Sequence, residues 1–271
     1  MFAGEEQNHI LLSGRVISPP VYSHTAYGED FSVFRMASVR RSGTADEINI
    51  VTAKRLLLSG EFSTEPGSRI RVAGQVRTYN ERSGQKMHLR VLVFGRRIAR
   101  AEDEVCDEND LILDGFVCRS PVGRISPLGR RICDLLLAVN RPHGKSDYIP
   151  CVVWGRNAER AASLSTGDRV WVAGRFQSRN YRKRLSPEEY EMRTAYEVSV
   201  NMLERPGNVP EQPGNMLERP GNVLEQRGKN FREISEKYPT KNIRSDASDG
   251  NRTVRRDKAS ADLGNDSQGA G

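Results

Sequence analysis

The sequence predicts an all-β protein made of two tandem copies of one small barrel, followed by a tail that lacks a core. Three observations support this prediction: an internal repeat, short alternating apolar runs with few helical stretches, and a change of composition after Arg205. A chain of 271 residues is long enough for two modest domains, each with its own core.

The repeat is visible when the chain is aligned with itself. The block that opens at Asn8 matches the block that opens at Asn109 with a shift of 101 positions and no gaps. The shift pairs Gly14 with Gly115, Pro20 with Pro121, Gly28 with Gly129, Ala37 with Ala138, Arg40 with Arg141, Gly43 with Gly144, Asp46 with Asp147 and Arg55 with Arg156. After a one-residue slip, residues 72–74 also match residues 172–174. We therefore predict domains at 8–105 and 109–204, joined by a short acidic linker.

The second copy shows its elements most clearly. Alternating apolar residues predict strands, with a short alanine-rich helix that ends near Gly167. The predicted strands are 111–117, 132–141, 148–154, 169–179 and 191–201, and the predicted helix is 157–163. Five strands with a short helix between the third and the fourth is the plan of an OB-fold barrel.

The segment 205–271 differs in character from both copies. The nine residues that begin at Asn201 recur at Asn215, and Pro-Gly pairs mark this 14-residue period. Beyond Arg227 the chain is polar and almost without aromatic residues. Such a segment buries too little apolar surface to offset the entropy of ordering, so we predict a disordered tail.

Composition favours a binding protein with a polyanionic partner. The net charge is +7, with 42 basic and 35 acidic side chains, which fits a polyanion without specifying one. The cysteines at 106, 118, 133 and 151 form no CxxC pair and the four histidines are scattered, so we expect reduced thiols, no metal and no cofactor. The opening residues are too polar for a signal peptide, and no apolar run reaches the ~20 residues that cross a membrane. We expect a cytoplasmic protein.

An enzyme is not favoured. The chain holds no P-loop, zinc-protease or nucleophile-elbow motif. Asp147, Asp168 and Glu159 are the acidic residues that could be considered as catalytic carboxylates. Surface charge, or turn and helix signals, account for them more simply.

The period of two in a strand predicts which side chains face outward. In the strand 148–154, Ile149, Cys151 and Val153 take the inner face, and Tyr148, Pro150, Val152 and Trp154 point outward. Tyr148 and Trp154 are about 20 Å apart at ~3.3 Å per residue. In the next strand, Val170, Val172, Gly174 and Phe176 point inward, whereas Arg169, Trp171, Arg175, Gln177 and Arg179 point outward. Tyr181, Arg182, Lys183 and Arg184 are expected in a protruding hairpin loop.

A face that carries both rings and arginines suits an unpaired polynucleotide, because bases stack on rings while guanidinium groups meet phosphates. The simpler alternative is that the rings fill a core and the arginines are solvated surface. Trp171 fits either a ligand or a subunit contact. The expected contacts are Tyr148, Trp154, Tyr181, Trp171, Arg141, Arg156, Arg169, Arg175, Arg179, Arg182 and Lys183 in the second copy, and Arg69, Arg71, Arg77 and Tyr79 in the first.

The first copy is poorer in rings. Glu47, Asn49 and Ala53 occupy the positions that match Tyr148, Pro150 and Trp154. We therefore predict unequal copies, of which the second binds more strongly.

The second copy resembles the bacterial single-stranded-DNA-binding proteins, through residues 149–159, 167–179 and 193–200. The first copy resembles them more weakly, so roughly 200 of the 271 residues are covered. The resemblance implies DNA binding in replication, recombination and repair near the nucleoid, with Tyr148, Trp154 and Tyr181 as stacking residues. It also implies that four OB domains act together, hence a homodimer with N-terminal strands at the subunit interface.

Family members usually end in an acidic tip with a terminal hydrophobic residue that recruits replication and repair proteins. This chain ends at Gly271 without such a tip, which puts recruitment of the usual kind in doubt and leaves replication and repair proteins open as partners. Two alternatives remain open from the residues: binding of single-stranded RNA, and a protein–protein assembly or adaptor role for the OB domains.

Overall fold

The structure is a computed structural model that describes residues 7–58, 62–102 and 107–206. Nearly all of the predicted tail, with its 14-residue repeat, lies outside the described residues. Within them, no helix is long and apolar enough to cross a membrane.

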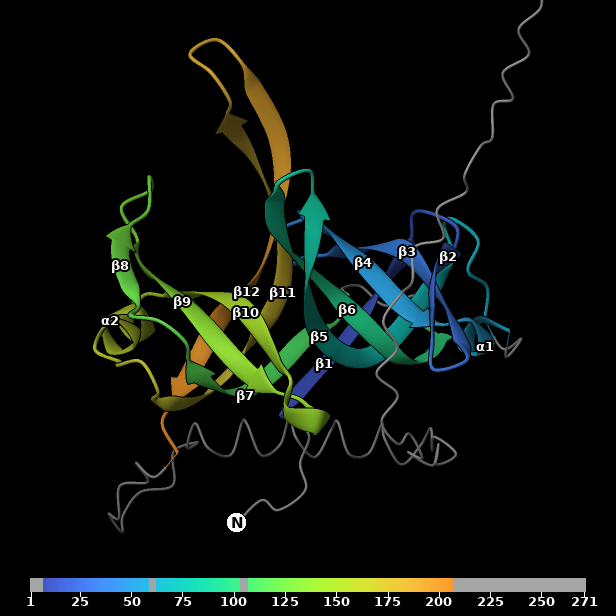
Figure 1. Cartoon of the computed structure of the whole chain (residues 1–271), viewed down its shortest axis with the longest axis horizontal. Coiled ribbons are helices and arrows are strands. Elements are labelled where there is room, and N and C mark those ends of the chain that lie inside the picture. The colour runs from blue at the N-terminus through green and yellow to red at the C-terminus, as the bar shows by residue number, and fades with distance from the viewer. Residues whose placement is uncertain (1–6, 59–61, 103–106, 207–271) are drawn as a thin grey trace, which may run out of the picture. The chain divides into compact units, whose positions relative to one another are not determined.

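The described strands form one continuous sheet in the order β2-β3-β4-β6-β5-β1-β7-β11-β12-β10-β9-β8, and additional pairings β3–β1 and β7–β9 close each half (Figure 1). The first half contains β1 (Asn8–Val16), β2 (Val21–Ala26), β3 (Glu29–Val39), β4 (Ala45–Ala53), α1 (Lys54–Leu57), β5 (Arg69–Ser83) and β6 (Lys86–Arg100). The second contains β7 (Asn109–Val117), β8 (Val122–Ile125), β9 (Arg131–Asn140), the 3-10 turn η1 (Pro142–Gly144), β10 (Ser146–Trp154), α2 (Arg156–Ala162), β11 (Arg169–Arg184) and β12 (Tyr190–Glu204). The predicted all-β fold of two tandem OB barrels is confirmed.

Each barrel closes through a close approach of two backbones at a glycine that the repeat had paired. A Cβ atom at Gly14 would overlap the carbonyl oxygen of Ala37, which lies on the closing strand β3. A Cβ atom at Gly115 would lie 2.9 Å from the carbonyl oxygen of Ala138 on β9. Only glycine leaves room for these approaches, which explains why both copies carry it there.

Burial follows the predicted alternation. Ile149, Cys151 and Val153 of β10 are buried, as are Val170 and the other inward residues of β11. Val152 and Gln177, which were predicted to point outward, are also buried, and both line a groove between the barrels.

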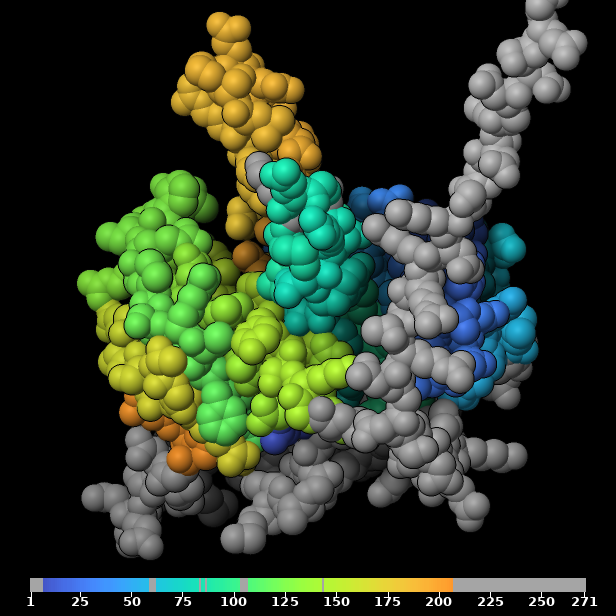
Figure 2. All heavy atoms as spheres, viewed as in Figure 1, coloured from blue at the N-terminus to red at the C-terminus, as the bar shows by residue number. Residues whose placement is uncertain are grey.

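The prediction of a loop at residues 181–184 is wrong. These residues continue β11, and the antiparallel register runs through Tyr181 opposite Arg193 to Arg184 opposite Tyr190. Consecutive charged residues hid the alternation that marks a strand, and only the partner strand makes it clear. The tip of the β11–β12 hairpin stands clear of the other described residues (Figure 2).

The two barrels pack through their N-terminal strands. β1 and β7 pair antiparallel, with Asn8 opposite Leu113 and Leu12 opposite Asn109. The Asn8 side chain exchanges two hydrogen bonds with the backbone of Val76, and Asn109 does the same with the backbone of Phe176. The N-terminal strands, expected between subunits, therefore meet within one chain.

Candidate nucleic-acid interface

A buried ionic network joins the barrels beside the outer face of β10. The Asp147 carboxylate is fully buried and accepts hydrogen bonds from Arg77 Nη1 (3.0 Å), the Thr78 backbone N–H (2.6 Å) and Arg141. Burial lowers the pKa of the Arg77 guanidinium because desolvation disfavours its charged form, and the bond to Asp147 opposes this shift. The interpretation of Asp147 as surface charge is wrong, because residues of the other barrel cover it.

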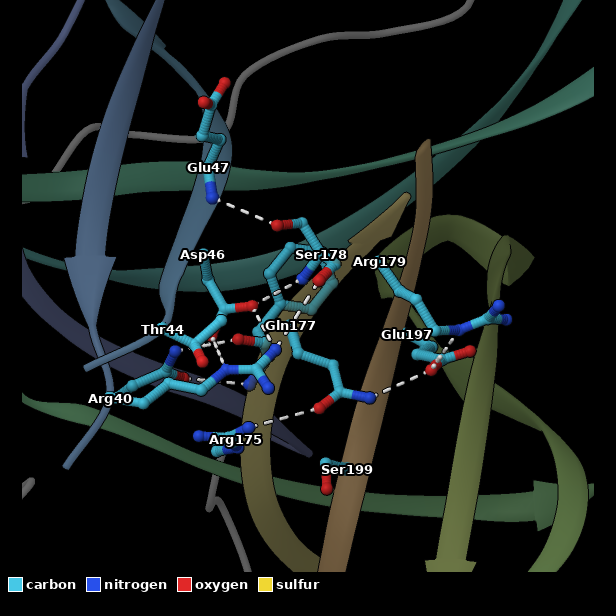
Figure 3. Close-up of polar contacts among 12 residues, drawn as sticks. Arg40, Thr44, Asp46, Glu47, Arg175, Gln177, Ser178, Arg179, Glu197 and Ser199 are labelled. Atoms are coloured by element: carbon cyan, nitrogen blue, oxygen red, sulfur yellow. Dashed lines mark hydrogen bonds and ion pairs between the residues drawn. The ribbon is translucent and has the colours of Figure 1, made fainter. Parts of the chain in front are cut away.

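The same arrangement recurs with the barrels exchanged. Asp46 is fully buried, accepts a hydrogen bond from Arg40 Nε (2.7 Å) and a second from the Ser178 backbone N–H (2.8 Å) (Figure 3). The hydrogen bond to Asp46 raises the pKa of Arg40. Two pseudo-symmetric clamps therefore hold the barrels together, and Arg77 and Arg141 belong to one of them.

A groove of about 820 Å³ lies between the barrels at the base of the β11–β12 hairpin. Arg35 and Arg40 contribute from the first barrel, and Arg124, Trp154 and Arg179 contribute from the second. The groove therefore combines one indole ring with four guanidinium groups, and the acidic residues Glu47 and Glu197 also line it.

Trp154 ends β10 and borders two hollows. Its side chain is held by a hydrogen bond from Nε1 to Ser199 Oγ (3.0 Å), and the residue remains 37% exposed. Besides the groove, it lines a second hollow of about 560 Å³ together with Arg130, Arg131 and Arg156. A ring that is fixed at its edge and flanked by cations on two sides has the properties of a stacking platform.

Arg179 connects the groove to the hairpin. Its Nε lies 3.4 Å from Glu197 Oε1, which also accepts a shorter bond from Gln177 Nε2 (2.9 Å) (Figure 3). The same guanidinium lies 5.7 Å from the centre of the Tyr181 ring, a cation–π distance. Tyr181 thus follows Arg179 outward along β11 and is 37% exposed.

Tyr148 lies at the opposite end of β10. Its backbone N–H donates to Thr78 Oγ1 (2.9 Å), its side chain is on the outer face, and the residue is 45% exposed. It does not line the groove, so the structure brings Trp154 and Arg179 together but leaves Tyr148 apart from them.

Several predicted contact residues lie on another face and already have acidic partners. Arg169 makes two hydrogen bonds to Asp114 (2.9 and 2.6 Å), which raise its pKa. Arg69 and Arg71 pair with the acidic linker, through Asp107 and Glu108 respectively. Half-buried Trp171 lies on this part of β11, opposite Asp114 in the β11–β7 pairing.

The remaining predicted residues are spread over the surface. Arg156 at the start of α2, Arg182 on the hairpin and Tyr79 on β5 are exposed, and Lys183 is half-buried. Arg175 is half-buried beside Gln177, and burial, with Arg40 nearby, lowers its pKa.

Sequence reasoning missed the arginines of the β8–β9 hairpin and the tyrosine on the groove wall. Arg124 pairs with Asp134 across this hairpin, which raises the arginine pKa. Tyr196 lines the groove and accepts a hydrogen bond from Asn49 Nδ2 (3.1 Å), while burial raises its pKa. An arginine-rich turn between two apolar runs was the available signal, but no strand was predicted at 122–125.

Within the described residues, no group of three His, Cys, Asp or Glu side chains is placed to hold a metal ion. The free thiols of Cys133 and Cys151 are buried, and desolvation raises the pKa of both.

Fold and groove together define a tandem OB-fold protein whose second barrel presents exposed rings and arginines. Residues 108–205 match the single-strand binding protein family. The second barrel therefore belongs to this family.

Relatives cover mainly the same region. The chain is 39% identical over 80 residues to a single-stranded DNA-binding protein of Halalkalibacterium halodurans, covering 27% of this chain and 48% of the relative. It is 34% identical over 107 residues to one of Oceanobacillus iheyensis, covering 37% and 66%. The chain spans about half the length of most curated relatives it matches.

The similarity to solved structures extends over both barrels. The crystal structure of wild-type single-stranded DNA binding protein from Thermus aquaticus has a TM-score of 0.55 and 26% identity. The match covers 76% of this chain and 96% of that one.

Proposed function

We propose that the protein binds single-stranded DNA with little sequence preference and thereby supports DNA replication, recombination and repair. The observation that carries this proposal is Trp154, whose ring is held by Ser199 at the junction of two arginine-lined hollows. The names of the relatives, which are single-stranded DNA-binding proteins, support the choice of ligand. The proposal involves no catalytic step.

The proposed path of the strand runs from Trp154 through the groove, past Arg179, to Tyr181 on the hairpin. Each base stacked on a ring contributes roughly 1–3 kcal/mol and requires no particular base. The Arg179 side chain is 53% exposed and its contact to Glu197 is long, so it can turn to a phosphate at little cost. Tyr148, at the far end of β10, extends the same outer face.

The ion-paired arginines are left out of the proposed interface. Arg77 and Arg141 hold Asp147 between the barrels, and Arg69, Arg71 and Arg169 are neutralised by acidic partners. Moving any of them to a phosphate would break an existing ion pair. The proposed phosphate contacts are therefore Arg156, Arg179, Arg182 and Lys183, whereas Arg124 is held by Asp134, and the contribution of these contacts should weaken with salt.

The proposal includes a homodimer that offers four barrels to one strand. Since β1 and β7 already pair within the chain, a second chain would contact a different face, such as the part of β11 around half-buried Trp171. Sedimentation in the binding buffer tests this part, and a monomeric mass with and without DNA would contradict it.

The main test is the Trp154→Ala variant titrated with oligo(dT). Loss of one stacking platform should weaken affinity by ~10-fold or more, because 1.4 kcal/mol corresponds to a factor of ten. Leu128→Ala, an 84% exposed position in the β8–β9 turn, is the matched control. Unchanged affinity in a folded Trp154→Ala variant would overturn the proposal. Competition with an RNA oligomer of the same sequence decides between DNA and RNA.

A further inference from the structure

The first barrel has a ring cluster of its own, formed by His24 of β2, Phe31 of β3 and Phe94 of β6. The His24 and Phe31 rings are stacked, with centroids 4.9 Å apart and planes 11° from parallel. Phe94 lies against Phe31 at 5.9 Å between centroids, with the planes tilted by 42°. Three rings from three strands therefore meet at one place.

Strand register locates this cluster at the position that Trp154 occupies in the second barrel. In the first barrel, Phe31 pairs directly with Ala53 at the end of β4. In the second, the corresponding pair is Ile132 with Trp154 at the end of β10. Ala53 thus stands where Trp154 does, and its cross-strand neighbour is a phenylalanine instead of an isoleucine.

The strands β6 and β12 show the same exchange of large and small side chains between the two barrels. Phe94 of β6 pairs with Val51 of β4, and Ser199 of β12 pairs with Val152 of β10. Phe94 therefore corresponds to Ser199, the residue that holds the Trp154 indole. The second barrel places one large ring over small neighbours, and the first places large rings around one small residue.

These rings lie outside the barrel core. On β3 the buried residues, Phe34 and Met36 among them, alternate with Phe31, and on β6 the buried Val93 is the direct neighbour of Phe94. His24 is exposed, and Phe31 and Phe94 are half-buried. Because side chains alternate in strands, both phenylalanines point to the outer face.

A basic residue follows the cluster as it follows Trp154. Arg55 is the second residue of α1, two positions after Ala53, and corresponds to Arg156, which begins α2 two positions after Trp154. Arg55 is 54% exposed, with Glu29 as its partner. Exposed rings have the chemistry that stacks on a base, and Arg55, held by Glu29, is a flanking charge and not a proposed phosphate contact.

We propose that the cluster of His24, Phe31 and Phe94 is a second base-stacking platform, so that both barrels engage one single strand of DNA. This inference rests on the proposed function of the second barrel. It assigns binding to the first barrel through rings on β2, β3 and β6, although its β4 lacks the rings that β10 carries.

The test uses the full chain with Phe31→Leu and Phe94→Leu together, which keeps apolar volume but removes the aromatic faces. We expect unchanged affinity for a short oligo(dT) that fills only the second barrel. Affinity for a long oligo(dT) should fall by ~10-fold, and the length of DNA covered should shorten. Val39→Ala is the control, since Val39 is exposed on the same face of β3 as Phe31 but at the strand's far end.

Unchanged affinity for the long oligomer and unchanged covered length would overturn the inference. The Trp154→Ala variant, measured in parallel, separates the two proposals. If Trp154→Ala weakens binding of oligo(dT) and the double variant does not, only the proposed platform on the first barrel is overturned. No effect from Trp154→Ala removes the proposed function itself.

If the double variant does not fold, a variant with a single fluorescent tryptophan in the cluster is used in its place. Phe31→Trp in a chain carrying Trp154→Phe and Trp171→Phe has a single tryptophan within the cluster. Stacking with DNA should quench its fluorescence on saturation with oligo(dT), and an unquenched signal at saturation would overturn the inference.

Discussion

The two barrels share a frame and differ on their outer faces. Tyr148 and Glu47 occupy equivalent positions, and their backbone N–H groups make equivalent bonds, to Thr78 Oγ1 (2.9 Å) and Ser178 Oγ (3.0 Å). The backbone at this position is needed to join the barrels, whereas the side chain is not. A ring can therefore stand in one barrel and a carboxylate in the other without any change in the fold.

The clamps give a second contrast. Asp147 pairs with two arginines, Arg77 and Arg141, whereas among the described residues Asp46 pairs with Arg40. Pseudo-symmetry thus extends to the buried carboxylate and the backbone it binds but not to the number of cations around it.

The largest expected effect is on stability, from Asp147→Ala. Removing a buried carboxylate that faces two guanidinium groups should lower the free energy of unfolding by about 3–5 kcal/mol. Asp46→Ala should cost less, because one arginine loses its partner there instead of two. Urea denaturation of both variants measures this difference, and a larger loss for Asp46→Ala would contradict the asymmetry.

The barrel closures should also differ in their tolerance of a methyl group. Gly14→Ala and Gly115→Ala should each destabilise the chain, by about 1–3 kcal/mol, through overpacking against a carbonyl oxygen. Gly14→Ala should be the worse of the two, because its Cβ atom would overlap the Ala37 oxygen and that of Gly115 would only approach the Ala138 oxygen. Thermal melts of the two variants measure this difference, and equal losses of stability would contradict it.

On DNA binding, Tyr148→Ala should weaken affinity for oligo(dT) by ~10-fold if the ring stacks on a base. Tyr148→Phe serves as the control, since it keeps the ring and the backbone bond to Thr78. A loss in Tyr148→Phe as large as in Tyr148→Ala would show that the hydroxyl, not the ring, matters.

The smallest expected effect comes from Glu47→Ala. Glu47 pairs with Arg35 at the groove, with about half of each side chain exposed. Removing Glu47 frees Arg35 to contact DNA, so the affinity for oligo(dT) at low salt should rise by the equivalent of ~0.2–1 kcal/mol. This gain should disappear at high salt, where exposed charges are screened. Weaker binding by Glu47→Ala at low salt would argue against DNA in this groove.

Much of the fold followed from local patterns in the sequence. The repeat, the inward residues of β10 and the outward positions of Tyr148 and Trp154 were predictable, because alternation is a property of a single strand. The paired glycines Gly14 and Gly115 were visible in the alignment, but their reason, the closure of each barrel, was not.

Local patterns in the sequence did not predict which charged residues form ion pairs and which remain available to contact a ligand. Arg69 and Arg71 looked like phosphate contacts until the chain brought the acidic linker beside them, 37 to 38 residues away in sequence. Asp147 looked exposed until residues of the other barrel covered it. Electrostatic partners are set by distances in space, which the sequence separation of two charges does not reveal.

By itself, then, the sequence determined the class of fold, the number of barrels and the faces of individual strands, because these depend on periodicity over a few residues. Only the tertiary structure decided which arginines remain available in the groove and where the rings of the first barrel gather. Those outcomes depend on strand register between distant segments, and a shift of one residue would place every side chain of a strand on the opposite face.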